Sequence, residues 1–466
     1  MVRIVTDLCV IGAGSGGLSL AAGAVQMGAR VVLVEGGEMG GDCLNTGCVP
    51  SKALLAAAKV ARGVGGGLGV AAGAAVVDFA GVKDHVQAVI AAIAPLDSQA
   101  RFEGLGVRVI RAYGRFISPT ELAAGGDVIA ARRFVIATGS RALVPGIPGL
   151  DGVAYLTNET IFDLRERPGH LVIIGGGPIG MEMAQAHRRL GSEVTVIEAA
   201  RVLGRDDDAA AAVVLAALRA EGVNVLEGVA VASVSGAVTV QLADGRQVAG
   251  SHLLLAIGRK VEVEALNLDD AGVGFTKRGV TVDARLRSTN RRIYAIGDAA
   301  GGMQFTHVAG WQAGIVLRQV VLGLPARAKG AIPWVTYTDP ELAQIGPTEA
   351  EARVSYGAAL RVVRAEFADN DRAMTEAATA GFLKLMVVRG RPVGVTIVGQ
   401  DAGELIGLWS LVIAQRLKLS AVAGMVAPYP TRGEISKRAA GAYFSPQLFA
   451  NPLVKRVVRL VQRYLP

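Results

Sequence analysis

Cysteine, histidine, aromatic and charged residues are all scarce in this chain. Its 466 residues include 3 Cys and 5 His, with 5% aromatic and 19% charged residues. So few cysteines cannot form a disulfide scaffold, and they favour a reducing compartment. The histidines are dispersed, so ligands for zinc are lacking and we predict no metal site. A hydrophobic content of 51% excludes a disordered or fibrous protein. The length predicts about two to four domains with substantial cores.

Basic residues outnumber acidic ones, 48 to 40, which gives a net charge of +8. This charge helps to attract anionic cofactors or a membrane surface. The basic residues are scattered through the sequence, so we predict no nucleic-acid partner. One charge-free run, residues 8–29, is long enough for a membrane span or a signal peptide, but its glycines suit a phosphate-binding turn better. We therefore expect a cytoplasmic protein.

A strand, a glycine-rich turn, a helix, a second strand and an acid follow one another at the start of the chain. The β-formers of residues 3–11 lead into the turn G-A-G-S-G-G, and the second strand, residues 30–34, ends at Glu35. This is the order that a dinucleotide needs. The glycines let the backbone approach a pyrophosphate at the helix N-terminus, and Glu35 can accept hydrogen bonds from a ribose. The three motif glycines are Gly12, Gly14 and Gly17.

The same pattern returns in the middle of the chain. A strand at residues 171–174 precedes a second glycine turn, and the next strand, residues 193–197, ends at Glu198. The first glycine and the terminal acid are equally far apart in the two units, which two unrelated turns would rarely show. The motif glycines here are Gly175, Gly177 and Gly180.

The second acid bears on cofactor choice. A carboxylate at Glu198 would accept from the 2′-hydroxyl of NADH and repel the extra phosphate of NADPH. Arg201 and Arg205 lie close by in the sequence, so NADPH is the alternative nucleotide. We predict NADH as the preferred nucleotide.

Cys43 and Cys48 lie in the segment GGDCLNTGCVPSK, residues 40–52, which leads into an Ala/Leu-rich helix. Two thiols this close can form an intramolecular disulfide, and a helix start near Cys48 would favour its thiolate. Two buried thiols that are neighbours by chance are the alternative on spacing alone.

With these motifs the chain resembles the flavoprotein pyridine nucleotide-disulfide oxidoreductases, the group that includes dihydrolipoamide dehydrogenase, glutathione reductase and mercuric reductase. The resemblance covers nearly the whole length. Residues 137–139 and 256–259 resemble the chain crossings between the cofactor domains. Residues 293–298 resemble the late FAD motif, whose aspartate binds the ribityl-phosphate region. The cofactor-binding residues that these motifs imply are Thr138, Gly139, Gly258, Arg259, Gly297 and Asp298.

The resemblance implies a path for two electrons, from NADH at the second glycine turn to FAD at the first, and on to a Cys43–Cys48 disulfide. By analogy Cys48 is the thiol nearest the flavin, and Cys43 is the interchange thiol that meets the substrate. Lys52 and Glu182 match the lysine–glutamate pair that the family places near the flavin. His307 matches a position beside the flavin, which favours a flavin contact or a structural role over that of a base.

The chain departs from the family near its C-terminus. In the disulfide-reducing members the partner subunit supplies a histidine before a proline and then a glutamate. Tyr429 stands in place of that histidine, whereas Glu434 keeps the place of the acid. A phenol, with an ordinary pKa of about 10, moves protons poorly near neutral pH, which argues against ordinary lipoamide or glutathione turnover. Aromatic packing at a dimer interface is the alternative role for Tyr429.

A tyrosine at this place is similar to mercuric reductase, whose acceptor is a thiol-bound metal ion. The C-terminal cysteine pair of that enzyme has no counterpart here, since Cys48 is the last cysteine. The resemblance predicts an FAD-dependent NADH oxidoreductase that reduces a thiol-bound metal ion, a small disulfide or a quinone-like acceptor. The alternatives are a dihydrolipoamide dehydrogenase with a substituted base and a membrane-associated redox sensor with slow turnover. Because Tyr429 and Glu434 would reach the disulfide of the other subunit, a homodimer is implied.

The predicted fold class is α/β, with two Rossmann-like dinucleotide-binding domains, for FAD and NAD, and a C-terminal α+β interface domain. We expect the FAD-binding domain at residues 1–145 and 265–330, the NAD(P)-binding domain at 146–264 and the interface domain at 331–448. Residues 449–466 form a basic amphipathic tail. This tail either packs on its own body, which we favour, or makes a peripheral contact with the inner face of a membrane.

Overall fold

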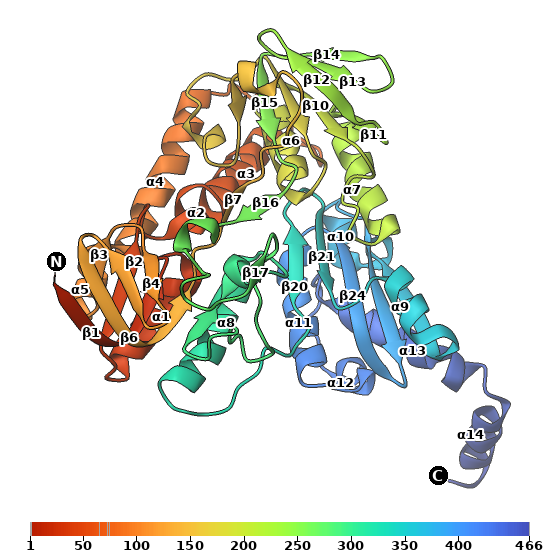
Figure 1. The fold of residues 1–466 in the computed structure, drawn as a ribbon. Coiled ribbons are helices and arrows are strands. Elements are labelled where there is room, and N and C mark those ends of the chain that lie inside the picture. The colour runs from red at the N-terminus through yellow and green to blue at the C-terminus, as the bar shows by residue number, and fades with distance from the viewer. Residues whose placement is uncertain (1, 65, 72, 74, 466) are drawn as a thin grey trace. The chain divides into compact units, whose positions relative to one another are not determined.

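The computed structural model describes residues 2–64, 66–71, 73 and 75–465, which form two compact units (Figure 1). Unit 1 consists of Met1–Gly66, Ala71–Ala200 and Val223–Lys329. Unit 2 consists of Gly67–Val70, Arg201–Gly222 and Gly330–Pro466. Unit 1 holds most of both predicted nucleotide domains, and unit 2 holds the predicted interface domain. The domain boundaries given above stay a prediction.

The first sheet of unit 1 surrounds the first glycine turn. Its parallel strands run in the order β3-β2-β1-β6, and β19 also pairs with β6. The parallel strands are β1 (Arg3–Ile11), β2 (Val31–Glu35), β3 (Arg108–Arg111), β6 (Asp127–Ile136) and β19 (Ile293–Ala295). Antiparallel β5 (Glu121–Ala124) and β4 (Arg115–Ser118) continue the sheet beyond β6. The turn that follows β1 therefore lies at the carboxyl edge of the parallel strands, where dinucleotides bind in such sheets.

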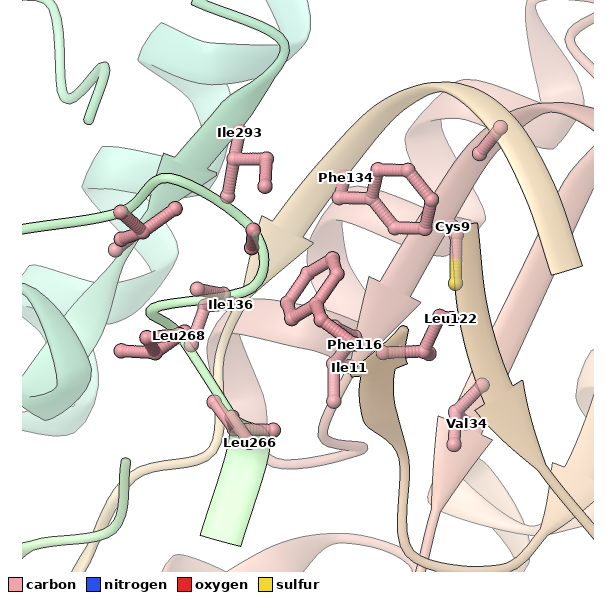
Figure 2. Packing of buried hydrophobic residues seen from close by; sticks show 14 of the residues in the cluster. Cys9, Ile11, Val34, Phe116, Leu122, Phe134, Ile136, Leu266, Leu268 and Ile293 are labelled. Carbon is pink, nitrogen blue, oxygen red and sulfur yellow. The ribbon is translucent and has the colours of Figure 1, made fainter. Parts of the chain in front are cut away.

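One face of this sheet carries a tightly packed core (Figure 2). Phe116 and Phe134 meet edge to face, with ring centroids 5.2 Å apart. Leu266 and Ile293 join the same cluster from far along the chain, so the segment after the second nucleotide unit returns to the first sheet. Cys9 is fully buried here, and burial raises the pKa of its thiol, which separates it from the other two cysteines.

The second sheet of unit 1 repeats the first. Its strands are all parallel, in the order β11-β10-β9-β15-β8. These strands are β8 (Tyr155–Leu156), β9 (His170–Ile174), β10 (Glu193–Glu198), β11 (Asn224–Glu227) and β15 (His252–Leu255). A separate antiparallel sheet follows, made of β12 (Val231–Ser235), β13 (Thr239–Leu242) and β14 (Gln247–Ala249). Two smaller antiparallel pairs are β7 (Ser140–Ala142) with β16 (Arg259–Val261), and β17 (Phe275–Thr276) with β18 (Gly279–Val280).

Helices connect and cover these sheets. The helices of unit 1 are α1 (Ser15–Gln26), α2 (Gly41–Asn45), α3 (Cys48–Gly63), α4 (Phe79–Asp97), α5 (Gln99–Gly104), α6 (Pro178–Arg189) and α8 (Thr306–Val320). The helix α1 follows the first glycine turn and α6 follows the second, so each nucleotide unit has the strand–turn–helix order that the sequence predicts.

Unit 2 is built on an antiparallel sheet in the order β20-β21-β24-β23-β22. Its strands are β20 (Pro333–Thr336), β21 (Glu341–Ile345), β22 (Leu360–Glu366), β23 (Phe382–Val388) and β24 (Arg391–Gly399). Its helices are α7 (Asp208–Ala220), α9 (Glu349–Tyr356), α10 (Asp371–Thr375), α11 (Ala402–Ala414), α12 (Leu419–Gly424), α13 (Glu434–Phe449) and α14 (Pro452–Tyr464). Trp409 of α11 is fully buried in the core against this sheet.

The predicted α/β fold is confirmed. Within the part of the chain that the structure describes, none of the helices has the length and apolar character needed to cross a bilayer. The stretch of residues 63–77 is rich in glycine and alanine, and its positions 65, 72 and 74 lie outside the described residues.

Candidate active site

The first glycine turn needs its glycines for steric reasons. Gly12 has a φ of +106°, and a Cβ there would lie 2.3 Å from the carbonyl oxygen of Ala137. A Cβ at Gly17 would lie 1.9 Å from the carbonyl oxygen of Gly12. Gly14, by contrast, caps α1 and has nothing within 4 Å of its Cβ position. The turn is closed toward the sheet and open at the start of α1, where a pyrophosphate can approach the backbone.

The second glycine turn has the same geometry. Gly175 has a φ of +112°, and a Cβ there would lie 2.4 Å from the carbonyl oxygen of Ala256. A Cβ at Gly180 would lie 2.0 Å from the carbonyl oxygen of Gly175, and Gly177 again faces open space. The first turns of α1 and α6 both lack acidic residues in the described chain. Both turns therefore fit an anionic dinucleotide.

Each unit also holds its terminal acid against its own turn. Glu35, at the end of β2, accepts hydrogen bonds from Ala13 N–H at 2.5 Å and Gly37 N–H at 2.6 Å. Glu198, at the end of β10, accepts hydrogen bonds from Gly176 N–H at 2.8 Å and from Ala200 N–H at 2.9 Å. These backbone donors fix each carboxylate beside its glycine turn, where a ribose hydroxyl would have to bind.

The two crossing motifs lie next to each other in unit 1, because β7 pairs with β16. Thr138 donates a hydrogen bond from Oγ1 to the carbonyl oxygen of Glu262, at 2.5 Å. Gly139 and Gly258 have φ values of +70° and +136°, which favour glycine. The motifs therefore join the two sheets of unit 1 by direct backbone contact.

The aspartate of the late motif lies in a polar cluster. Ser140 Oγ donates to Asp298 at 2.5 Å, and Arg259 Nε lies 3.8 Å from the same carboxylate. Arg259 also pairs with Asp42 at 3.2 Å. Burial raises the pKa of Asp298, which the hydrogen bond from Ser140 opposes. Gly297 N–H donates to a glutamine side chain of α8 at 2.7 Å, which fixes the backbone before Asp298.

Cys43 lies in the short helix α2, and Cys48 is the first residue of α3. Both are free cysteines in the structure, Cys43 half-buried and Cys48 exposed. The Thr306 hydroxyl, at the start of α8, lies 3.4 Å from Cys48 Sγ.

The two thiols differ strongly in acidity. The hydrogen bond from Cys43 lowers the pKa of Cys48 to about 6, with further help from Thr306 and Lys52. The same hydrogen bond, together with burial, raises the pKa of Cys43. A negative charge on the reduced pair therefore resides on Cys48. Within the single chain, Cys48 is more exposed than Cys43. The interchange role suggested for Cys43 would require the opposite order, because the interchange thiol meets the substrate.

The structure brings the predicted ion pair together. Lys52 lies one turn after Cys48 in α3, and its Nζ is 2.7 Å from Glu182 Oε2. Glu182 belongs to α6 and is only 5% exposed. This ion pair thus joins α3 to α6, the helix that follows the second glycine turn, one helical turn from Cys48.

The substituted position, Tyr429, lies in unit 2 and is 68% exposed. Its hydroxyl donates a hydrogen bond to Asp371 at 2.7 Å, and this carboxylate raises the pKa of the phenol. Glu434 begins α13, five residues later. Arg432 pairs with Asp401 and a glutamate, which anchors the intervening segment. Within its own chain Tyr429 therefore presents its ring outward and its hydroxyl to an acid.

His307 is exposed, and its ring stacks on that of Phe305 with centroids 5.3 Å apart. It follows Thr306, so it lies one residue from the group that contacts Cys48. Sequence reasoning missed Thr306 and Asp371. The position of Thr306 beside His307 could have signalled the first, whereas Asp371 lies 58 positions from Tyr429 and carries no local signal.

Comparison with known families agrees with this geometry. The sequence model described as pyridine nucleotide-disulphide oxidoreductase matches residues 6–313, and the dimerisation domain of the same family matches residues 332–440. The chain belongs to this family. The family uses FAD and NAD(P)H, so the chain is a flavoprotein oxidoreductase, and the dimerisation domain supports a homodimer.

Relatives with different names match almost equally well. A mercuric reductase of Bacillus cereus is 32% identical over 92% of this chain and 70% of its own length. The dihydrolipoyl dehydrogenase of Bacillus subtilis is 32% identical over 92% of this chain and 96% of its own. A Cu(II) complex of the HOCl-induced flavoprotein disulfide reductase RclA of Escherichia coli superposes with a TM-score of 0.83 and 30% identity, over 93% of this chain and 99% of that one.

Proposed function

We propose that this family member uses Cys43 and Cys48 to pass two electrons from NADH to a thiol-bound metal ion. One observation carries the proposal. The reduced pair holds its charge on Cys48, while the phenol that replaces the family's histidine is tied to Asp371. Such a site can deliver electrons but is poorly equipped to exchange protons with a disulfide substrate.

The two glycine turns support the cofactor assignment. Gly12, Gly14 and Gly17 with Glu35 would hold FAD, together with Asp298 and its neighbours from the crossing motifs. Gly175, Gly177 and Gly180 with Glu198 would hold the nicotinamide nucleotide. FAD bound there supplies two-electron chemistry between a hydride donor and a disulfide.

A preference for NADH has two supports. Glu198 is held by backbone donors beside the second turn, where its charge opposes a 2′-phosphate. Arg201, a candidate for binding that phosphate by its place in the sequence, pairs with Asp208 within unit 2.

The chain's own groups account for the protons. Two electrons and one proton convert a Cys43–Cys48 disulfide into a Cys43 thiol and a Cys48 thiolate. When the pair returns to a disulfide, two electrons and that proton leave. One divalent ion reduced to the metal, or two Cu(II) ions reduced to Cu(I), would consume the electrons. Lys52, paired with Glu182, helps to hold the charge on Cys48.

The relatives support a metal ion as the acceptor. Several are named mercuric reductase, and the RclA structure is described as a Cu(II) complex. A small disulfide or a quinone-like compound is the other acceptor class. A dihydrolipoamide dehydrogenase with a substituted base is the second candidate, favoured by the coverage of the Bacillus subtilis relative. A redox sensor would share the cofactors but reduce its flavin slowly.

Steady-state assays with NADH and Cu(II), Hg(II), lipoamide, glutathione disulfide and quinones test the proposal. We expect turnover with a metal ion that Cys48→Ser abolishes. Tyr429→His is the matched variant, and it should raise lipoamide turnover by at least about tenfold, since it restores a group that titrates near neutral pH. Fast lipoamide turnover by the unchanged protein would instead establish the dehydrogenase, and slow flavin reduction by NADH would establish the sensor.

A further inference from the structure

The C-terminal helix α14 places its aliphatic and its basic residues on opposite faces. Successive side chains are about 100° apart around a helix, so the sequence fixes two arcs. The apolar arc runs from Leu460 through Val457 and Val461 to Val458. The polar arc runs from Gln462 through Lys455 and Arg459 to Arg456. The apolar arc is uninterrupted and covers nearly half of the circumference, whereas the polar arc includes the N-terminal Pro452.

Most of the apolar arc is exposed in the described part of the chain, with Val454 half-buried. No residue of α14 is buried, with Leu453 68% and Val461 41% exposed. Figure 1 shows α14 projecting from α13, away from the sheet of unit 2. The packing on its own body that the sequence favours is therefore wrong, because the helix extends beyond the core that it would have to meet.

The helix is nevertheless well defined at its start. Asn451 caps it by accepting from Leu453 N–H at 2.9 Å, and Pro452 is its first residue. Both features are typical of helix N-termini. The end of α13 adds two more exposed apolar side chains, Leu448 and Phe449, just before α14 in the sequence.

Charge and size identify the partner. Residues 450–466 contain basic side chains but no acidic ones, so the surface that α14 meets should be anionic. A helix of 13 residues is about 20 Å long, too short for the ~30 Å core of a bilayer. An apolar arc this wide exceeds the single row of anchors that a helix inserts into a groove on a protein.

We propose that α14 docks this protein on an anionic lipid surface. The helix lies in the plane of the interface, with its aliphatic side chains among the acyl chains and its lysine and arginines at the headgroups. None of its residues belongs to the site described above. The enzyme is thereby held at the membrane surface without change to its redox pair.

Vesicle flotation of the full-length holoprotein tests this directly. We expect binding to vesicles of phosphatidylcholine and phosphatidylglycerol in equal parts, weakened by high salt, and little binding to phosphatidylcholine alone. Val461→Asp and Gln462→Asp form a matched pair, since they place the same charge at neighbouring positions on opposite arcs. We expect Gln462→Asp to weaken binding about fivefold and Val461→Asp about fiftyfold.

Several outcomes would overturn the proposal. Equal flotation with and without residues 449–466 would do so, as would equal weakening by the two substitutions. If Val461→Asp converted dimers into monomers in sedimentation and the unchanged protein did not float, a second copy of the chain would be the partner. Flavin content and the rate of flavin reduction by NADH should be the same in every variant, which separates this test from that of the acceptor.

Discussion

The acidity of Cys48 depends on a few neighbouring groups. Cys43 donates the hydrogen bond that contributes most to lowering the pKa of Cys48 to about 6, and Thr306 and Lys52 add to it. Since the thiolate is the reactive form, alkylation of Cys48 in the reduced enzyme should rise with pH through about 6 and level off above it. An ordinary thiol would still gain reactivity well above pH 8, near its pKa of about 8.5.

Thr306→Val tests the contribution of the hydroxyl. The substitution keeps the shape of the side chain but removes a donor to the thiolate, so the pKa of Cys48 should rise. We expect iodoacetamide to alkylate Cys48 about fivefold more slowly at pH 6, with little change at high pH. Thr306→Ser keeps the hydroxyl and should behave as the unchanged enzyme. Identical pH profiles for the valine and serine variants would contradict a role for Thr306.

Asp371 controls the acidity of Tyr429. Its carboxylate accepts the phenol hydrogen bond and opposes a phenolate, so it raises the pKa of Tyr429. Asp371→Asn should lower that pKa toward the ordinary value for tyrosine, near 10. An absorbance titration of tyrosinate measures the change, and Tyr429→Phe identifies which part of the signal comes from Tyr429. If the titration of Asp371→Asn matched that of the unchanged protein, the hydrogen bond would not exist in solution.

At the scale of elements, the local patterns were predicted from the residues themselves. The long-range pair of Lys52 with Glu182 was predicted through the family resemblance, and other long-range contacts were not predicted. The strand expected at residues 3–11 is β1, the helix start near Cys48 is that of α3, and the strand ending at Glu198 is β10. Alternating β-formers, glycine turns and terminal acids are local signals, so they fix these elements. Thr306 meets Cys48 across 258 positions, a contact that depends on how α3 and α8 pack.

A buried ion cluster in unit 2 was also invisible in the sequence. Lys384 of β23 is 5% exposed, with its Nζ 2.9 Å from both carboxylate oxygens of Asp207 and 2.8 Å from Glu349. Asp207 also caps α7 by accepting from two backbone N–H groups. Its partner lies 177 positions away, so no local pattern joins them. The cluster ties α7 to the sheet of unit 2.

Lys384→Met should destabilise unit 2 strongly, because it leaves the buried Asp207 carboxylate without its cation, whereas Glu349 still pairs with Arg353. We expect a loss of about 3 kcal/mol in the free energy of unfolding, measured by urea denaturation. Asp207→Asn is the milder control, since asparagine still caps α7 and Glu349 still pairs with the lysine, and it should cost about 1 kcal/mol. A loss for Lys384→Met no larger than that for Asp207→Asn would show that the ion cluster does not hold α7 to the sheet.

At the scale of the whole molecule, the family resemblance implies an active site that is divided between two subunits. The cysteines lie in unit 1, Tyr429 and Glu434 lie in unit 2, and the family's dimerisation domain matches residues 332–440. If the partner subunit supplies Tyr429, two different inactive subunits can complement each other. A Cys48→Ser subunit keeps an intact Tyr429, and a Tyr429→Ala subunit keeps an intact cysteine pair.

Co-expression of these two subunits with different tags therefore makes a decisive experiment. Random pairing gives hybrids in about half of the dimers, each with one complete site, so the mixture should reach about a quarter of the unchanged activity per subunit. Purified hybrids should reach about half. Each variant alone should be nearly inactive with the metal-ion acceptor. If Tyr429 served the cysteines of its own chain, no site in a hybrid would be complete, and the purified hybrid would be as inactive as its parents. Full activity of the Tyr429→Ala homodimer would instead remove Tyr429 from the site, and the tyrosine would then be part of the packing between subunits.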